Sequence, residues 1–237
     1  MQTSFARDML TRTQEGAAAL VRAVRPAVTG RDHLTLAALA AGETAAWSGL
    51  FTWRTLGSAA TVTAPVLLAL RPDCSPATRV GLIAAAVGQA AKRGTGSAPA
   101  QPSALGVASV SAQYAAFAWQ LRESRNDATG WALRAGAWAA GVALARTRSE
   151  RLATPIAGVP AAALSALAGD PALRAADATQ GLSHGANLLL ASEAATVART
   201  RAAQLPAVGK LLAAGQSAAQ TVGLVLLVDG LARRGRR

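Results

Sequence analysis

The chain has 237 residues, of which 51% are hydrophobic, yet it carries a formal net charge of +12. Mean hydropathy is +0.27 and the pI is about 11.7, so apolar and basic residues must be segregated along the sequence. The basic residues recur between apolar segments rather than along one face or tail, which argues against nucleic-acid binding and is typical of loops between membrane spans. The single cysteine, Cys74, excludes an internal disulfide and a paired-thiol metal site.

The first 31 residues lack the compact apolar run of a signal peptide. We interpret residues 1–31 as a cytoplasmic amphipathic helix, with Leu10, Leu20, Val21 and Val24 on one side. Residues 32–232 then form a transmembrane domain, and residues 233–237 a basic C-terminal tail.

Proline, glycine and charge clusters divide the rest of the chain into apolar segments. The sequence predicts an all-α polytopic membrane bundle of about eight short, alanine-rich transmembrane helices. The predicted spans are 34–53, 56–71, 78–92, 103–121, 130–146, 152–168, 182–198 and 208–230. A soluble helical bundle would need a polar face on each helix, and segments 103–121 and 211–228 carry no charge to provide one.

The distribution of Lys and Arg predicts the orientation. With eight spans, the side that holds both termini has 14 basic residues outside the spans or at their ends, and the other side has nine. The excess predicts a multi-pass protein of the inner (plasma) membrane with both termini in the cytoplasm. The bilayer and a lipid substrate are the expected partners.

The two halves of the chain look alike when they are superimposed with an offset of about 103 residues. Leu105-Gly106 followed by Gln113 matches Val208-Gly209 followed by Gln216, and Gly88-Gln89 matches Ser192-Glu193. This similarity predicts an internal repeat of four plus four helices.

Polar side chains inside the spans are the candidate functional residues, because they are costly in lipid. Glu193 lies in an otherwise apolar run and is the candidate acid and base, with Gln89 as its catalytic partner. A helix contact that only pairs Glu193 with another polar side chain is an equally good interpretation. The predicted substrate-binding residues are Glu43, Gln113, Asn187, Ser192, Gln216 and Gln220. Neither His33 nor His184 has a second ligand at metal-binding spacing, so no metal or cofactor is expected.

These residues occur in an order that resembles the lysoplasmalogenase-like (YhhN) family of eight-helix membrane proteins, from about position 34 onward. Where that family has Lys-Pro, Gly-Asp and a Gly-rich entry leading to His, this chain has Ala64-Pro65, Gly88-Gln89 and Leu105-Gly106 leading to Gln113. Where the family has Gly-Ala leading to Ser-Asp, and then Tyr and Gln, the chain has Gly185-Ala186 leading to Ser192-Glu193, and then Gln216 and Gln220.

The resemblance implies a membrane hydrolase that cleaves the vinyl-ether bond of lysoplasmalogen-type lipids to a fatty aldehyde and a glycerophospho-headgroup compound. In the family, carboxyl groups would stand at the two positions that Gln89 and Glu193 occupy here. Gln89 cannot ionise. Three alternatives stay open: Glu193 suffices while Gln89 orients water or the headgroup, Glu43 replaces the missing acid, or the chain keeps the fold as a non-catalytic lipid-binding or scaffold protein.

Overall fold

A computed structural model describes residues 2–51, 54–91, 103–145, 148–202 and 204–236. The described residues are predominantly helical and contain no β-strand, which confirms the predicted all-α class. The helices are α1 (Gln2–Val28), α2 (His33–Phe51), α3 (Arg54–Ala69), α4 (Pro76–Ala91), α5 (Ala104–Gln120), α6 (Ala128–Leu144), α7 (Arg148–Ala168), α8 (Pro171–Ala175), α9 (Gln180–Arg201) and α10 (Pro206–Arg234).

Each predicted span falls on one of the long helices α2 to α7, α9 and α10. Side-chain caps explain two of the starts: Ser103 Oγ accepts from Gly106 N at the start of α5, and Asp127 Oδ1 accepts from Gly130 N at the start of α6. The short helix α8, which Asp170 caps, was not predicted. The predicted span ends at 53, 92 and 146 lie outside the described residues.

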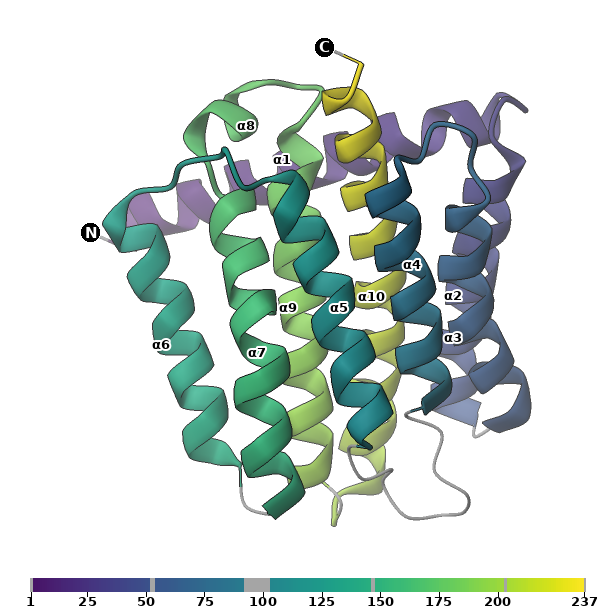
Figure 1. The fold of residues 1–237 in the computed structure, drawn as a ribbon, viewed down its shortest axis with the longest axis vertical. Helices are drawn as coiled ribbons and strands as arrows, with labels where there is room; N and C mark the ends of the chain where they lie inside the picture. The colour runs from purple at the N-terminus through teal and green to yellow at the C-terminus, as the bar shows by residue number, and fades with distance from the viewer. Residues whose placement is uncertain (1, 52–53, 92–102, 146–147, 203, 237) are drawn as a thin grey trace.

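The long helices pack side by side in an up-and-down bundle (Figure 1). Helices α2, α4, α6 and α9 run away from the end where α1 lies, and α3, α5, α7 and α10 run back toward it. The most extensive contacts are those of α10 with α9 and α2, of α2 with α3 and of α4 with α5, while α6 lies at the edge against α7.

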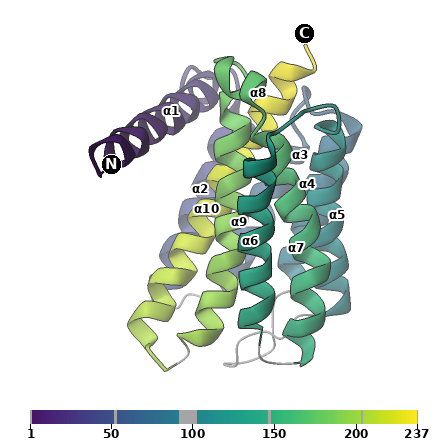
Figure 2. The same cartoon turned by 90° about the vertical axis from the view of Figure 1, so that its left-hand side faces the viewer.

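Helix α1 lies across one end of the bundle, and its N-terminal part projects past the side of it (Figure 2). Its contacts are with α2, α9 and α10. The small residues Ala19, Ala23 and Ala27 are buried, whereas Leu10 and Val21 are 64% and 67% exposed. Of the apolar side chains named in the prediction, Leu10 and Val21 therefore point away from the bundle, whereas Leu20 packs against its core. The C-terminal end of α10 lies at this same end.

The core is built from leucines, two aromatic rings and close helix contacts at glycine. Leu82, Tyr114 and Phe117 are among the fully buried side chains. Helices α9 and α10 approach through Gly185 and Gly223, where a Cβ on Gly185 would lie 2.7 Å from the Gly223 carbonyl oxygen. A larger residue there would separate the two backbones, which explains the small residues at this crossing.

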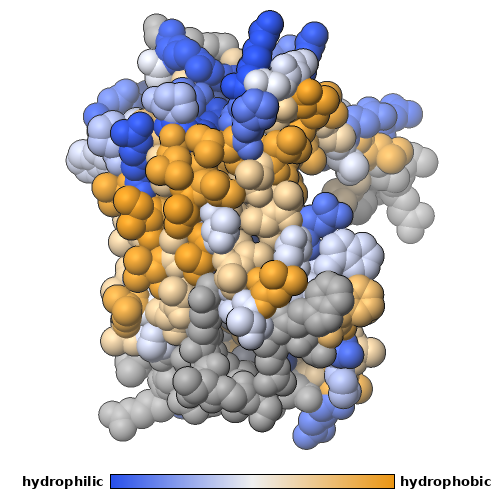
Figure 3. Space-filling model, turned by 90° about the vertical axis from the view of Figure 1, so that its right-hand side faces the viewer, coloured by the Kyte–Doolittle hydropathy of each residue, from blue (hydrophilic) through white to orange (hydrophobic). Residues whose placement is uncertain are grey.

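The outward faces of several helices are apolar. Leu133, Ile156 and Val159 are more than half exposed, as are Val80 and Ile83. Seen from the side of α2 and α3, apolar residues form a broad band beneath a hydrophilic end (Figure 3). By length and composition alone, α10 is the one helix among the described residues that qualifies as a membrane span, and the apolar segments Thr55–Ala69 and Ala153–Ala168 are shorter.

Candidate functional site

Glu193 and Tyr114 join α9 to α5 inside the bundle. The Tyr114 hydroxyl donates to Glu193 Oε1 at 3.0 Å and lies 3.5 Å from the Leu189 carbonyl oxygen. Tyr114 is 1% exposed, and the buried Ser192 next to Glu193 donates to the same Leu189 carbonyl at 2.8 Å. The predicted acid and base therefore has a buried hydroxyl donor from another helix, which orients its carboxyl group.

Gln113 precedes Tyr114 on α5 and is 1% exposed. Its Nε2 is a buried donor that has no hydrogen-bond partner in the described part of the chain. A buried amide donor left unpaired is unfavourable by about 1–3 kcal/mol, so such groups usually have a bound water or ligand as an acceptor.

Gln89 is buried on α4, with 7% exposure. The neighbouring Gly88 packs on α5, because a Cβ at Gly88 would lie 3.1 Å from a methyl group of Val110. Val110 is about one helical turn from Gln113. Gln89 and Gln113 are thus both buried near the contact of α4 with α5.

Three of the other predicted binding residues, Gln216, Gln220 and Glu43, lie in two different places. On α10, Gln216 is buried and accepts from Arg199 Nη1 at 2.9 Å, and Gln220 is buried one turn further along. Glu43 lies elsewhere, exposed on the outer face of α2, where its Oε1 accepts from Trp47 Nε1 at 3.3 Å. The structure does not bring Glu43 next to Tyr114 and Glu193.

Asn187 takes part in a series of hydrogen bonds between helices that was not predicted from the sequence. Ser165 Oγ on α7 donates to Asn187 Oδ1 on α9 at 2.7 Å, and Arg134 Nε on α6 donates to Ser165 Oγ at 3.3 Å. Ser165 is fully buried. Arg134 is a basic residue inside the predicted span 130–146, and this was the signal that could have identified these hydrogen bonds.

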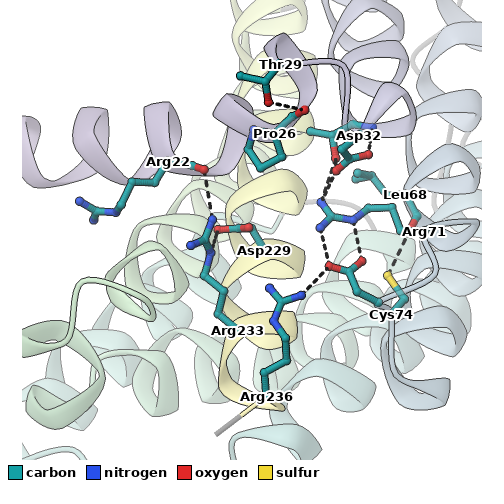
Figure 4. A network of polar contacts seen from close by, with 12 residues as sticks. Arg22, Pro26, Thr29, Asp32, Leu68, Arg71, Cys74, Asp229, Arg233 and Arg236 are labelled. Atoms are coloured by element: carbon teal, nitrogen blue, oxygen red, sulfur yellow. Dashed lines mark hydrogen bonds and ion pairs between the residues drawn. The ribbon is translucent and has the colours of Figure 1, made fainter.

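An arginine network joins the chain segments at the α1 end (Figure 4). Arg71 donates to both carboxylate oxygens of Asp73, at 3.0 and 2.8 Å, and forms an ion pair with Asp32 at 3.1 Å. Arg233 bonds Asp229 at 2.8 Å and the Arg22 carbonyl at 3.1 Å. The network therefore links α1, the α3–α4 connection and the C-terminal end of α10.

The pKa shifts of Asp73 and Cys74 in this network have structural causes, namely hydrogen bonding and burial. The hydrogen bond from Arg71, opposed by burial and reinforced by the charges of Arg71 and Arg236, lowers the pKa of Asp73. Burial is the main cause that raises the pKa of Cys74 to about 11, so its thiol is protonated at neutral pH. Cys74 Sγ lies 3.3 Å from the Leu68 carbonyl oxygen, in a packing role.

The outer surface between α4 and α5 carries an open apolar groove with a volume of about 400 Å³. Its lining includes Val80, Ile83, Val87, Ala108 and Ala112. The groove follows the outward side of the two helices that carry Gln89 and Gln113. Among the described residues, no group of three or more His, Cys, Asp and Glu side chains could hold a metal ion.

Comparisons with known proteins leave the family open. No protein-family model, curated protein or solved structure among those compared matches the chain. The similarity to the lysoplasmalogenase-like family therefore stays a prediction from short motifs, and the geometry of the bundle has to carry the functional argument.

Proposed function

We propose that the chain is a multi-pass protein of the inner membrane with both termini in the cytoplasm. The observation that carries this proposal is the apolar outer surface of the bundle, which includes Leu133, Ile156 and Val80. Figure 3 shows apolar surface of this kind beneath the hydrophilic α1 end. A water-soluble bundle would present polar side chains there. Helix α1 would lie in the headgroup layer at the cytoplasmic face, with Leu10 and Val21 exposed to lipid.

A labelling experiment tests this topology. In a Cys74→Ser background, one new cysteine replaces Gly235 at the α1 end and another replaces Gln204 at the opposite end, both at exposed positions. In intact spheroplasts, a membrane-impermeant maleimide is expected to label the cysteine at 204 but to label the one at 235 only after permeabilisation. Equal labelling of both without permeabilisation contradicts the orientation, and recovery of the chain in the soluble fraction contradicts membrane insertion.

The chemistry that this bundle supports best is hydrolysis of the vinyl-ether bond of a lysoplasmalogen-type lipid. The contact between Glu193 and the buried Tyr114 hydroxyl carries this proposal, because it holds a half-buried carboxyl group in one orientation between α9 and α5. A carboxyl group oriented by a second side chain is the usual arrangement for a general acid and base. The groove between α4 and α5 offers an apolar surface for the alkenyl chain.

One carboxyl group can serve both halves of the reaction. Protonated Glu193 transfers its proton to the vinyl carbon distal to the ether oxygen, which forms a C–H bond and an oxocarbenium ion. The resulting carboxylate takes a proton from a water molecule as the water oxygen attacks the carbon attached to the ether oxygen. The hemiacetal then breaks its C–O bond, its hydroxyl proton moves to the leaving oxygen, and aldehyde and alcohol are released with one water consumed. Gln89 and the unpaired Gln113 Nε2 are the candidate groups that orient water and headgroup.

The test is aldehyde release from lysoplasmalogen by the full chain purified in detergent. We expect Glu193→Gln to lower the rate about a hundred- to ten-thousand-fold, which is the usual loss when a general acid or base is removed. Glu123→Gln is the matched control, because that carboxylate is 74% exposed on a loop and pairs with Arg122. A rate that Glu193→Gln leaves unchanged contradicts the proposed role.

The second candidate function is a non-catalytic lipid-binding or scaffold protein on the same fold. Two observations favour it: Gln89 cannot ionise, and Glu43 faces outward on α2, away from Tyr114 and Glu193. A helical, monodisperse wild-type protein that releases no aldehyde would support this function and overturn the hydrolase. A Glu43→Gln variant adds a further test, because loss of activity there would identify Glu43 as the second acid.

A further inference from the structure

Arg134 is a half-buried cation whose side chain reaches from α6 to the buried Ser165 on α7. It lies on α6, the edge helix, in which Gly130 is the buried residue. Its neighbours Trp131 and Leu133 are 41% and 66% exposed. Arg134 is six residues after the start of α6, about 9 Å along the helix at 1.5 Å per residue.

The guanidinium of Arg134 turns back toward the α1 end of the bundle. Its Nη1 donates to the Gly130 carbonyl at 3.1 Å and its Nε to Ser165 Oγ at 3.3 Å. A Cβ on Gly169, at the end of α7, would lie 3.3 Å from Nη2. The charged group therefore lies near the level where α6 begins and α7 ends, which corresponds to the headgroup layer in the proposed membrane placement.

The oxygens bonded to this cation are neutral. In the described part of the chain, Arg134 forms no ion pair, and Nη2 has no hydrogen-bond acceptor. The nearby carboxylates are used elsewhere: Asp127 Oδ1 caps α6 by accepting from Gly130 N, and Asp170 accepts from Arg125 N at 2.7 Å and Ala172 N at 2.8 Å. A half-buried guanidinium at a membrane surface is more stable when an anion balances its charge.

We propose that Arg134 binds the phosphate of an anionic phospholipid in the leaflet at the α1 end. Nη1 and Nη2 form a fork that matches two phosphate oxygens. The buried Ser165, which is fixed by its hydrogen bond to Asn187, holds Nε and thereby the orientation of the fork. The exposed Trp131 and Leu133 contact the acyl chains. This inference rests on the proposed membrane placement but is independent of the hydrolase chemistry.

The experiment uses the full chain in detergent, with phosphatidylglycerol or phosphatidylcholine of identical acyl chains. Phosphatidylglycerol is expected to raise the thermal unfolding midpoint by about 2–4 °C more than phosphatidylcholine and to be retained in native mass spectrometry. Arg134→Gln is expected to abolish this difference and to weaken retention about tenfold, the loss of one charge-assisted pair. Arg122→Gln is the matched control, because it removes one exposed positive charge at the same end.

The outcomes distinguish an error in the phosphate site from an error in the membrane placement. Equal effects of the two lipids on the wild-type chain, or an undiminished preference in Arg134→Gln, overturn the site, whereas a chain that is monodisperse without detergent overturns the membrane placement instead. An equal shift with sn-glycerol 3-phosphate assigns the site to a free phosphate compound and overturns the lipid assignment. If Arg134→Gln does not fold, Arg134→Lys is used instead. An ammonium cannot bind two oxygens in parallel, so the rise in unfolding midpoint with phosphatidylglycerol is expected to be smaller in this variant. An undiminished rise contradicts the role of the guanidinium fork.

Discussion

Arg71 at the α1 end and Gln113 inside the bundle differ in how completely their side chains are paired. At the α1 end, Arg71 bonds Asp73 twice, Asp32 once and the Thr35 hydroxyl once, and its side chain is 7% exposed. In the interior, the amide nitrogen of Gln113 has no acceptor among the described residues. Fully paired groups stabilise the fold, whereas incompletely paired groups retain bonding capacity for a ligand.

The largest effect on stability is expected from Arg71→Ala. This change leaves Asp32 and Asp73, whose side chains are 13% and 24% exposed, without their shared cation. Breaking a buried ion pair costs about 3–5 kcal/mol. We expect a large fall in the thermal unfolding midpoint in detergent, with a smaller fall for Arg71→Lys. A midpoint within 1–2 °C of wild type, roughly 0.5 kcal/mol, would mean that the network adds little to the fold.

Tyr114→Phe tests the hydrogen bond that joins α5 to α9 at Glu193. The variant removes the donor to Glu193 and keeps the ring, so we expect a loss of about 1–3 kcal/mol in unfolding free energy. Under the hydrolase proposal, aldehyde release falls as well, because the carboxyl group loses its orientation. If stability falls while the rate stays constant, the contact is purely structural.

Gln113→Leu should have the opposite sign for stability and for function. Replacing a buried unpaired amide with an apolar side chain of similar size is expected to be neutral or to stabilise by about 1 kcal/mol. Lipid binding or turnover is expected to decrease if the amide donates to the ligand. A variant that is less stable than wild type would show that Gln113 already has a partner, such as a buried water.

The smallest effect concerns acid pH and Asp73. Because the pKa of Asp73 is lowered in the folded protein, mainly by the hydrogen bond from Arg71, its contribution is fully present above the ordinary aspartate pKa of about 3.9. The contribution disappears as the pH falls from that value through the lowered pKa. Between pH 5 and pH 2 the unfolding midpoint of Asp73→Asn should therefore decrease less than that of wild type. Parallel curves would show that Asp73 is not the source of the acid sensitivity.

The positions of the helices could be predicted from the sequence because their boundaries have local causes. Ser103 and Asp127 cap the helices that follow them, and proline, glycine and arginine separate the apolar segments. The candidate acid Glu193 could be found for a similar reason, since a carboxyl group within an apolar run stands out.

Only the tertiary structure decided which polar residues meet. Helices that are apolar or small on all sides carry no periodic signal for the face that turns inward, so the sequence did not separate the outward-facing Glu43 from Glu193, which contacts the buried Tyr114. Arg134 meets Ser165 because α6 packs on α7, and Asn187 joins them because α9 packs on α7. These contacts depend on how helices from distant parts of the chain pack together, and no local pattern encodes that.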